Sequence, residues 1–165
     1  MILKSLKKSL LINISLTFLI FLLDRISKIY VISFHKKLFG SEIFSSKYLN
    51  IHLIWNEGIA FGFLSFDQQN LYNLLTILIM IIILVICFMI SKSNGVKKYS
   101  LIFILGGALG NVYDRIFFKA VPDFIDFHVG NFHWFIFNVA DIFITLGVFF
   151  MILLEFTDIN KSKKI

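Results

Sequence analysis

Residues 71–90 read LYNLLTILIMIIILVICFMI and contain no charged side chain. A helix needs about 20 apolar residues to cross the roughly 30 Å hydrocarbon core of a bilayer, so this stretch predicts a transmembrane helix. Three further stretches are also long and apolar enough, at about 10–30, 99–118 and 134–154, although each contains charged residues. The sequence therefore predicts an all-α polytopic membrane protein with four transmembrane helices.

The composition agrees with a membrane protein. Of 165 residues, 58% are apolar and only 16% are charged, whereas soluble domains average roughly 45–50% and 25%. A chain this short cannot hide so much apolar surface in one soluble core, which argues against a soluble enzyme and against a nucleic-acid-binding module. The single cysteine, Cys87, excludes a disulfide framework, and inside an apolar run it is expected to act as packing material.

The lysines indicate the direction of the spans. Three lie in each of the N-terminal segment, the connection between the second and third spans, and the C-terminal tail: Lys4, Lys7, Lys8, Lys92, Lys97, Lys98, Lys161, Lys163 and Lys164. The first connection also has three, Lys36, Lys37 and Lys47, but Glu42 and Asp67 offset them, and the third connection has only Lys119. The positive-inside rule places the N-terminal segment, the second connection and the C-terminal tail in the cytoplasm. Four spans also require both ends on one side, so the two arguments agree. The connection at about 35–69 is then expected on the outer side.

This outer connection predicts a β-rich loop between the first two helices. Leu49, Ile51, Leu53 and Trp55 alternate with mostly polar residues, which is the period of a half-buried strand. One apolar face beside a membrane domain predicts a small sheet resting on the bilayer surface; a solvated hairpin is the alternative. Because there is no internal repeat and no linker, we expect residues 1–165 to form a single membrane-embedded domain.

Five carboxylates are predicted to gather near the outer membrane surface: Asp24, Asp114, Asp123, Asp126 and Asp141. Asp123 and Asp126 lie in the short connection before the fourth span. Asp141 lies seven residues beyond Trp134, which places it about 10 Å below the outer boundary at ~1.5 Å per residue. Charges inside a span are costly, so their gathering at one level predicts a functional site open to the outer side.

Helical spacing brings polar groups onto shared faces. Asn138, Asp141 and Thr145 lie at i, i+3 and i+7 on one face of the fourth span. In the third span Asn111 lies near Asp114 and Arg115 by the same rule.

The segment Gly106-Gly107-Ala108-Leu109-Gly110 forms a surface of small residues that allows two helices to approach closely. The polar faces of the third and fourth spans can then meet in a narrow cleft. For Asp114 and Arg115 the alternative is an ion pair that only holds the bundle together.

Two carboxylates in a dry cleft cannot both ionise, so one keeps its proton while the other accepts one from water. Such a pair supplies a general base and a general acid, which can hydrolyse an amide without a metal or a nucleophilic side chain. Spacing alone leaves the partner of Asp141 open among Asp114, Asp123 and Asp126.

Other hydrolytic chemistries have less support in the sequence. A zinc site formed by His128 and His133 with Asp123 or Asp126 is conceivable, but the H-E-x-x-H pattern is absent. Neither a G-x-S-x-G nucleophile turn nor a G-x-x-x-x-G-K phosphate loop occurs.

Five segments, in order and spacing, resemble the bacterial lipoprotein signal peptidase family, signal peptidase II: Leu23–Lys28, Asn56–Gly62, Gly106–Arg115, Val121–Asp126 and Phe137–Asp141. The resemblance extends over roughly residues 20–147. It implies an aspartic endopeptidase, a hydrolase of the bacterial inner membrane with its site at the outer face. Such an enzyme removes signal peptides from prolipoproteins by cutting before the cysteine that carries diacylglycerol.

Position by position, the resemblance implies that Asp123 and Asp141 form the catalytic pair. It implies that seven further residues line or support the site: Asn56, Asn111, Asp114, Arg115, Asn138, Asp24 and Lys28. The outer loop is similar to the family's β-cradle on the membrane. The implied partners are diacylglyceryl-prolipoproteins and membrane lipid. No cofactor, metal or nucleic acid is implied, and we expect a monomer.

The sequence departs from the family pattern at three positions. Arg25 follows Asp24 where the family usually has Gln, Ile142 follows Asp141 where it usually has Ser, and Glu57 adds an acid. None of these changes removes a carboxylate of the implied catalytic pair.

A small four-span proton-coupled transporter is the alternative function, with Asp114 and Asp141 as proton relays. It would need polar residues leading to both membrane faces. The segments Met80–Cys87 and Gly147–Leu154 are instead almost purely apolar, which favours a site open on one side only.

Overall fold

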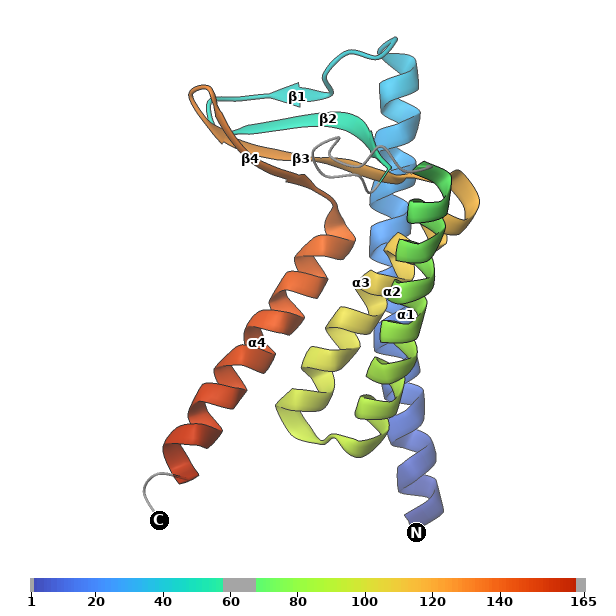
Figure 1. Cartoon of the computed structure of the whole chain (residues 1–165), viewed down its shortest axis with the longest axis vertical. Helices are drawn as coiled ribbons and strands as arrows, with labels where there is room; N and C mark the ends of the chain where they lie inside the picture. Colours follow the sequence, from blue (N-terminus) through green and yellow to red (C-terminus); the bar gives the residue numbers. More distant parts are fainter. Residues whose placement is uncertain (1, 58–67, 163–165) are drawn as a thin grey trace.

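The computed structural model describes residues 2–57 and 68–162, and it contains four long helices and four strands. In chain order these are α1 (Ile2–Lys37), β1 (Phe44–Ser45), β2 (Leu49–Asn56), α2 (Gln68–Lys92), α3 (Gly95–Phe118), β3 (Val121–Val129), β4 (Phe132–Phe137) and α4 (Val139–Ser162). The sheet lies across one end of the helices, and both chain ends lie at the other end (Figure 1).

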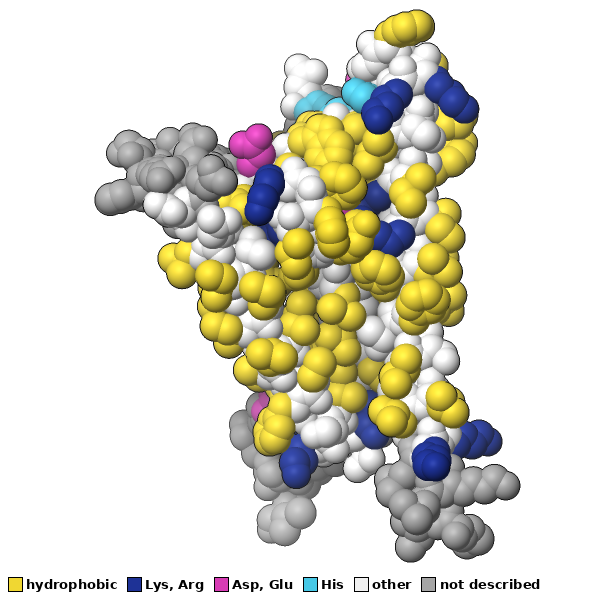
Figure 2. All heavy atoms as spheres, turned by 90° about the vertical axis from the view of Figure 1, so that its right-hand side faces the viewer, with side chains coloured by type: hydrophobic (Ala, Val, Ile, Leu, Met, Phe, Trp, Pro, Cys, Tyr) yellow, Lys and Arg dark blue, Asp and Glu magenta, His cyan; other side chains and the backbone are white. Residues whose placement is uncertain are grey.

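All four predicted spans are confirmed as helices that are long and apolar enough to cross a membrane. Figure 2 shows hydrophobic side chains over the middle of one face, with Lys and Arg side chains both at the lower end and in the upper part. Helix α3 packs against α1, α2 and α4 and is the most enclosed of the four. The fold class predicted from the sequence is therefore confirmed.

The sheet is larger than predicted. It is antiparallel with the order β1-β2-β3-β4, so half of it comes from residues 121–137, after the third helix. The segment 134–137 was predicted to begin the fourth span, but it belongs to β4, and α4 begins only at Val139. The reason is that a short apolar run is equally suitable for a strand and for a membrane helix, so periodicity cannot separate the two.

The predicted strand is confirmed as β2, but burial does not alternate along it, because Asn50 is its buried residue and Trp55 is exposed. The strand carries a polar group to the site. Its register with β3 shifts between Ile51 and Ile54, which is the mark of a β-bulge. Beyond the shift, Ile54 pairs with Asp123, and Asn56 at the end of the strand pairs with Val121. The strand therefore ends beside the first residues of β3.

The small residues of α3 allow close contact with two neighbouring helices. A Cβ atom at Gly106 would lie within 3.0 Å of Ile20 on α1, and one at Gly107 would lie within 3.0 Å of the Ala140 carbonyl on α4. A Cβ atom at Gly110 would contact the carboxylate of Asp24. The predicted close approach is confirmed, and these glycines set the positions of α1 and α4 around α3.

Candidate active site

The site begins at Asn138, the residue between β4 and α4. Its side chain is fully buried, and its Oδ1 accepts a hydrogen bond from the backbone N–H of Asp141 at 3.2 Å. In return Asp141 Oδ2 accepts from the backbone N–H of Asn138 at 3.1 Å. This reciprocal pair is a capping box, which fixes the start of the helix and the orientation of both side chains.

Asn138 also binds the second carboxylate. Because its Oδ1 already faces an N–H donor, its Nδ2 points the other way and donates to Asp123 Oδ1 at 2.6 Å. Asn56 Nδ2, from the end of β2, donates to Asp123 Oδ2 at 2.9 Å. Asp123 and Asp141, from a strand and a helix, are thus both held by Asn138.

Asp123 is only 4% exposed. Burial raises the pKa of Asp123 above its ordinary value, and the nearby charge of Asp141 acts in the same direction. The hydrogen bonds from Asn56 and Asn138 lower this pKa, as does the charge of Lys28, but the net direction is upward. Asp123 therefore holds a proton more readily than an exposed aspartate does.

Asp141 is oriented from α3. Its Oδ1 accepts from Asn111 Nδ2 at 2.8 Å, while Asn111 Oδ1 accepts from Lys28 Nζ at 2.9 Å. An ammonium group only donates, so Lys28 fixes which end of the Asn111 amide faces Asp141. Lys28 acts on the carboxylate through Asn111 and is itself 1% exposed.

A buried ion network supports this side of the site. Lys28 Nζ lies 2.9 Å from Asp24 and 2.7 Å from Asp114, and Arg25 lies 2.7 Å from Asp24 and 2.5 Å from Asp114. Two acids and two bases balance, which is how charges are tolerated in such an environment. Asp24 Oδ1 also accepts from the backbone N–H of Ala140, connecting the network to the first turn of α4.

The pairing of Asp114 differs from the sequence-based alternative. Its partners are Arg25 and Lys28 on α1, and its neighbour Arg115 takes no part in these ion pairs. The Nε of Arg115 is buried and has no hydrogen-bond partner within the part of the chain that the structure describes. The sequence analysis did not assign Arg25 to the site. Its position next to Asp24 inside an apolar span is the signal that could have predicted its role in the ion network.

The depth predicted for Asp141 is also wrong. It is the third residue of α4, at the level where the sheet meets the helices, because β4 occupies the residues before Asn138. Thr145 was predicted on the same face as Asn138 and Asp141. Within the part of the chain that the structure describes, it makes no hydrogen bond with either residue.

Asp126 lies apart from the two linked carboxylates. It is 1% exposed and bonds to His133 Nδ1 at 2.8 Å, and His128 stacks on His133 with ring centroids 5.0 Å apart. Within residues 2–57 and 68–162, no three His, Cys, Asp or Glu side chains are grouped to hold a metal ion. The candidate zinc ligands therefore do not converge on one point. Asp123 is hydrogen-bonded to Asn56 and Asn138, whereas Asp126 bonds to His133.

The structure thus brings together most of the residues that the sequence singled out: Asn56, Asn111, Asp123, Asn138 and Asp141, with Asp24, Lys28 and Asp114 behind them. A buried carboxyl with a raised pKa beside a second carboxylate is an arrangement suited to general acid and base catalysis.

Comparisons with known proteins agree with this arrangement. The family model described as signal peptidase (SPase) II matches residues 16–157. Proteins named lipoprotein signal peptidase are similar over most of their length: 47% identical in Pelagibacter ubique, over 94% of this chain and 93% of that one, and 39% identical in Anaplasma marginale, over 90% and 86%. The protein of the same name from Aquifex aeolicus is 37% identical, over 92% and 89%.

Two solved structures described as bacterial membrane enzymes share the fold. One is 26% identical with a TM-score of 0.74, covering 93% of this chain and 92% of that one. The other is 29% identical with a TM-score of 0.71, covering 86% and 90%. With four membrane helices and relatives of this kind, the chain is a bacterial membrane protein and a peptidase of the signal peptidase II family.

Proposed function

We propose that this protein is an aspartic endopeptidase that removes signal peptides from diacylglyceryl-modified prolipoproteins, with Asp123 and Asp141 as its catalytic pair. The observation that carries the proposal is the position of Asn138, whose amide donates to Asp123 while its backbone N–H donates to Asp141. One buried residue thereby holds two carboxylates from different elements in a fixed relation. No comparable link joins Asp114 or Asp126 to Asp141 within the described ranges.

The two carboxylates have different roles. We assign the proton to Asp123 rather than to Asp141, because burial raises the pKa of Asp123. Asp141, with hydrogen bonds from Asn111 and from the Asn138 backbone, is the carboxylate that acts as base. It takes a proton from water as the water oxygen attacks the scissile carbonyl carbon. Asp123 then gives its proton to the leaving amine nitrogen as the C–N bond breaks.

The remaining residues support the pair. Asn56 and Asn138 orient Asp123, and Asn111 orients Asp141 under the control of Lys28. Asp24 and Asp114 neutralise the buried cations, and Asp24 also holds the start of α4. The buried Nε of Arg115 is a free donor among the described residues, and we assign it to a carbonyl of the bound substrate.

The position of the site suits a lipid-modified substrate. The pair lies where the sheet meets the helices, and a diacylglyceryl group would hold the scissile bond at this membrane surface. The lysines at the opposite end support an orientation with both termini in the cytoplasm and the site on the outer face. We propose that the chain acts as one membrane-embedded domain and as a monomer.

A gel-mobility assay in detergent with a purified diacylglyceryl-modified prolipoprotein tests the proposal. Wild type is expected to cleave with or without a chelator, and both Asp123→Asn and Asp141→Asn are expected to be inactive. Asp126→Asn is the matched control, since it removes a buried carboxylate from the same strand whose side-chain partner, among the residues that the structure describes, is His133. If Asp126→Asn were inactive and Asp123→Asn still cleaved the substrate, the assignment of Asp123 would be refuted. Inhibition by chelator would refute metal-free catalysis.

A further inference from the structure

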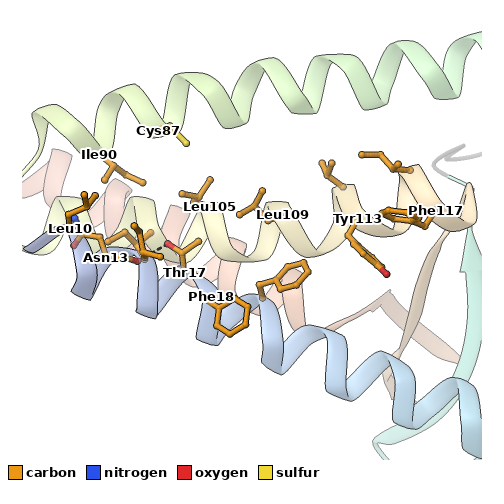
Figure 3. Close-up of a pocket in the computed structure, with 15 residues that line it drawn as sticks. Leu10, Asn13, Thr17, Phe18, Cys87, Ile90, Leu105, Leu109, Tyr113 and Phe117 are labelled. Carbon is orange, nitrogen blue, oxygen red and sulfur yellow. Dashed lines mark hydrogen bonds between the residues drawn. The ribbon is translucent and has the colours of Figure 1, made fainter. Parts of the chain in front are cut away.

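A groove between three helices lies away from the active site. It has a volume of about 650 Å³, and side chains from α1, α2 and α3 line it, among them Ile14, Cys87, Leu105 and Leu109. Figure 3 shows Cys87, Leu105 and Leu109 directed into the space between α2 and α1, with α3 as the floor. The lining is almost wholly apolar, with Asn13 and Thr17 as the polar residues near one end.

The shape of the groove suits a lipid acyl chain. The groove is open along one side rather than enclosed, and an acyl chain is thin enough to lie along it. The α3 residues that line the groove run from Ile102 to Phe117, about 22 Å at ~1.5 Å per residue, so the groove extends over most of the roughly 30 Å hydrocarbon core.

Two lysines mark the end of the groove farthest from the sheet. Lys7 precedes Leu10 by three residues on α1, and Lys98 precedes Ile102 by four on α3, so each follows the groove-lining face of its helix. Side chains on a helix tilt toward its N-terminus, which directs both ammonium groups toward the membrane surface. Lys7 is exposed and Lys98 is half-buried, and neither makes a salt bridge in the described part of the chain.

From the size of the groove and the charge at its end, we propose that it is a binding site for an anionic phospholipid. One acyl chain lies along α3 between α1 and α2, and the phosphate lies between Lys7 and Lys98. Basic residues at the mouth of a pocket between transmembrane helices are suited to anionic headgroups. Asn13, about 9 Å above Lys7 along the axis at ~1.5 Å per residue, is placed to donate to an ester carbonyl of the lipid.

The only cysteine of the chain provides a direct probe. Cys87 is exposed on the α2 wall of the groove, so a bound acyl chain should shield its thiol. The full-length protein in detergent is titrated with dioleoylphosphatidylglycerol or with zwitterionic dioleoylphosphatidylcholine, and the rate of Cys87 modification by a maleimide is measured. We expect saturable slowing by the anionic lipid at concentrations where the zwitterionic lipid has little effect.

Two double variants distinguish lipid binding in the groove from general attraction of anionic lipid to a basic protein surface. K7Q/K98Q is expected to weaken the anionic lipid's protection of Cys87 by roughly tenfold to thirtyfold in apparent affinity. K8Q/K97Q removes the same charge from adjacent positions that turn away from the groove, and Lys97 lines a different pocket against α4. This control is expected to behave as wild type. Equal loss in both double variants, or no preference for the anionic lipid, would overturn the proposal.

A third variant tests the groove itself. Leu105→Trp places a larger side chain on the groove floor and is expected to reduce protection of Cys87 even with both lysines present. If lipid protection were unchanged, the acyl chain would lie elsewhere and the proposal would fail. Sedimentation in detergent supplies a further check, because shielding of Cys87 that accompanied dimer formation would assign the groove to a second copy.

Discussion

Replacing Gly107 with Ala should impair catalysis without touching a catalytic side chain. The new Cβ would lie within 3.0 Å of the Ala140 carbonyl and of Ile144, whereas ordinary van der Waals contact begins at 3.4 Å. A backbone carbonyl cannot rotate away, so α3 and α4 must separate by several tenths of an ångström. Ala140 precedes Asp141, and the separation therefore moves the base away from Asn111.

The size of the effect follows from this displacement. Overpacking of this kind costs about 1–3 kcal/mol of stability. A misplacement of about 1 Å at a reacting group can cost about 100-fold in rate. For a smaller shift we expect a loss of roughly tenfold or more in kcat, with KM much less affected.

Gly147→Ala is the matched control. Its Cβ would meet the Ser100 carbonyl and Ile104 at the same α3–α4 interface, again within 3.0 Å. Gly147 lies about 10 Å along α4 from Ala140, far from the two carboxylates. Thermal unfolding in detergent should show a similar loss of stability in both variants, and prolipoprotein cleavage should fall only in Gly107→Ala. Equal activities in the two variants would refute the argument that helix spacing positions Asp141.

Four further outcomes are expected. Lys28→Met leaves an unbalanced buried negative charge and should lower the unfolding free energy by about 3–5 kcal/mol. Adding Asp114→Asn should restore part of the lost stability. A double variant that melts at no higher temperature than Lys28→Met would contradict the charge balance. Cleavage should decline as the pH rises through the raised pKa of Asp123, because the general acid then loses its proton. Asn56→Ala removes a hydrogen bond that lowers this pKa, so the alkaline limb of the pH–rate profile should move to higher pH; a shift to lower pH would reverse the assigned roles. Asn138→Ala should cost about 0.5–2 kcal/mol through loss of the helix cap and abolish cleavage, and a variant that melts lower yet cleaves normally would remove Asn138 from the site.

Much of this architecture could be predicted because it depends on local patterns. The uncharged run at 71–90 predicts a span from length alone, and the small residues from Gly106 to Gly110 predict close helix contacts. The start of α4 is also encoded in a local pattern, but the predicted start at residue 134 was wrong. Asn138-Val-Ala-Asp141 has the spacing of a capping box, which would have placed the first helical residue at 139 rather than 134.

The pairing of the charges could not be predicted from any local pattern. The cations that bind Asp114 lie 86 and 89 positions earlier in the chain, at Lys28 and Arg25. Its adjacent residue Arg115 points elsewhere, because neighbours on a helix are about 100° apart. The link between Asp123 and Asp141 through Asn138 likewise depends on β3 and β4 forming a hairpin, which the apolar sequence of 132–137 did not distinguish from a helix.

The ion network has a consequence for the biogenesis of the protein. Helix α1 contributes one acid and two bases, so its membrane-embedded part carries a net positive charge until Asp114 arrives on α3. All of α2 is synthesised between these two helices. We therefore expect the first helix to complete its integration only when the third helix arrives. A nascent chain that ends at Lys92 should remain beside the insertion machinery, and the order of synthesis then couples membrane insertion to assembly of the catalytic centre.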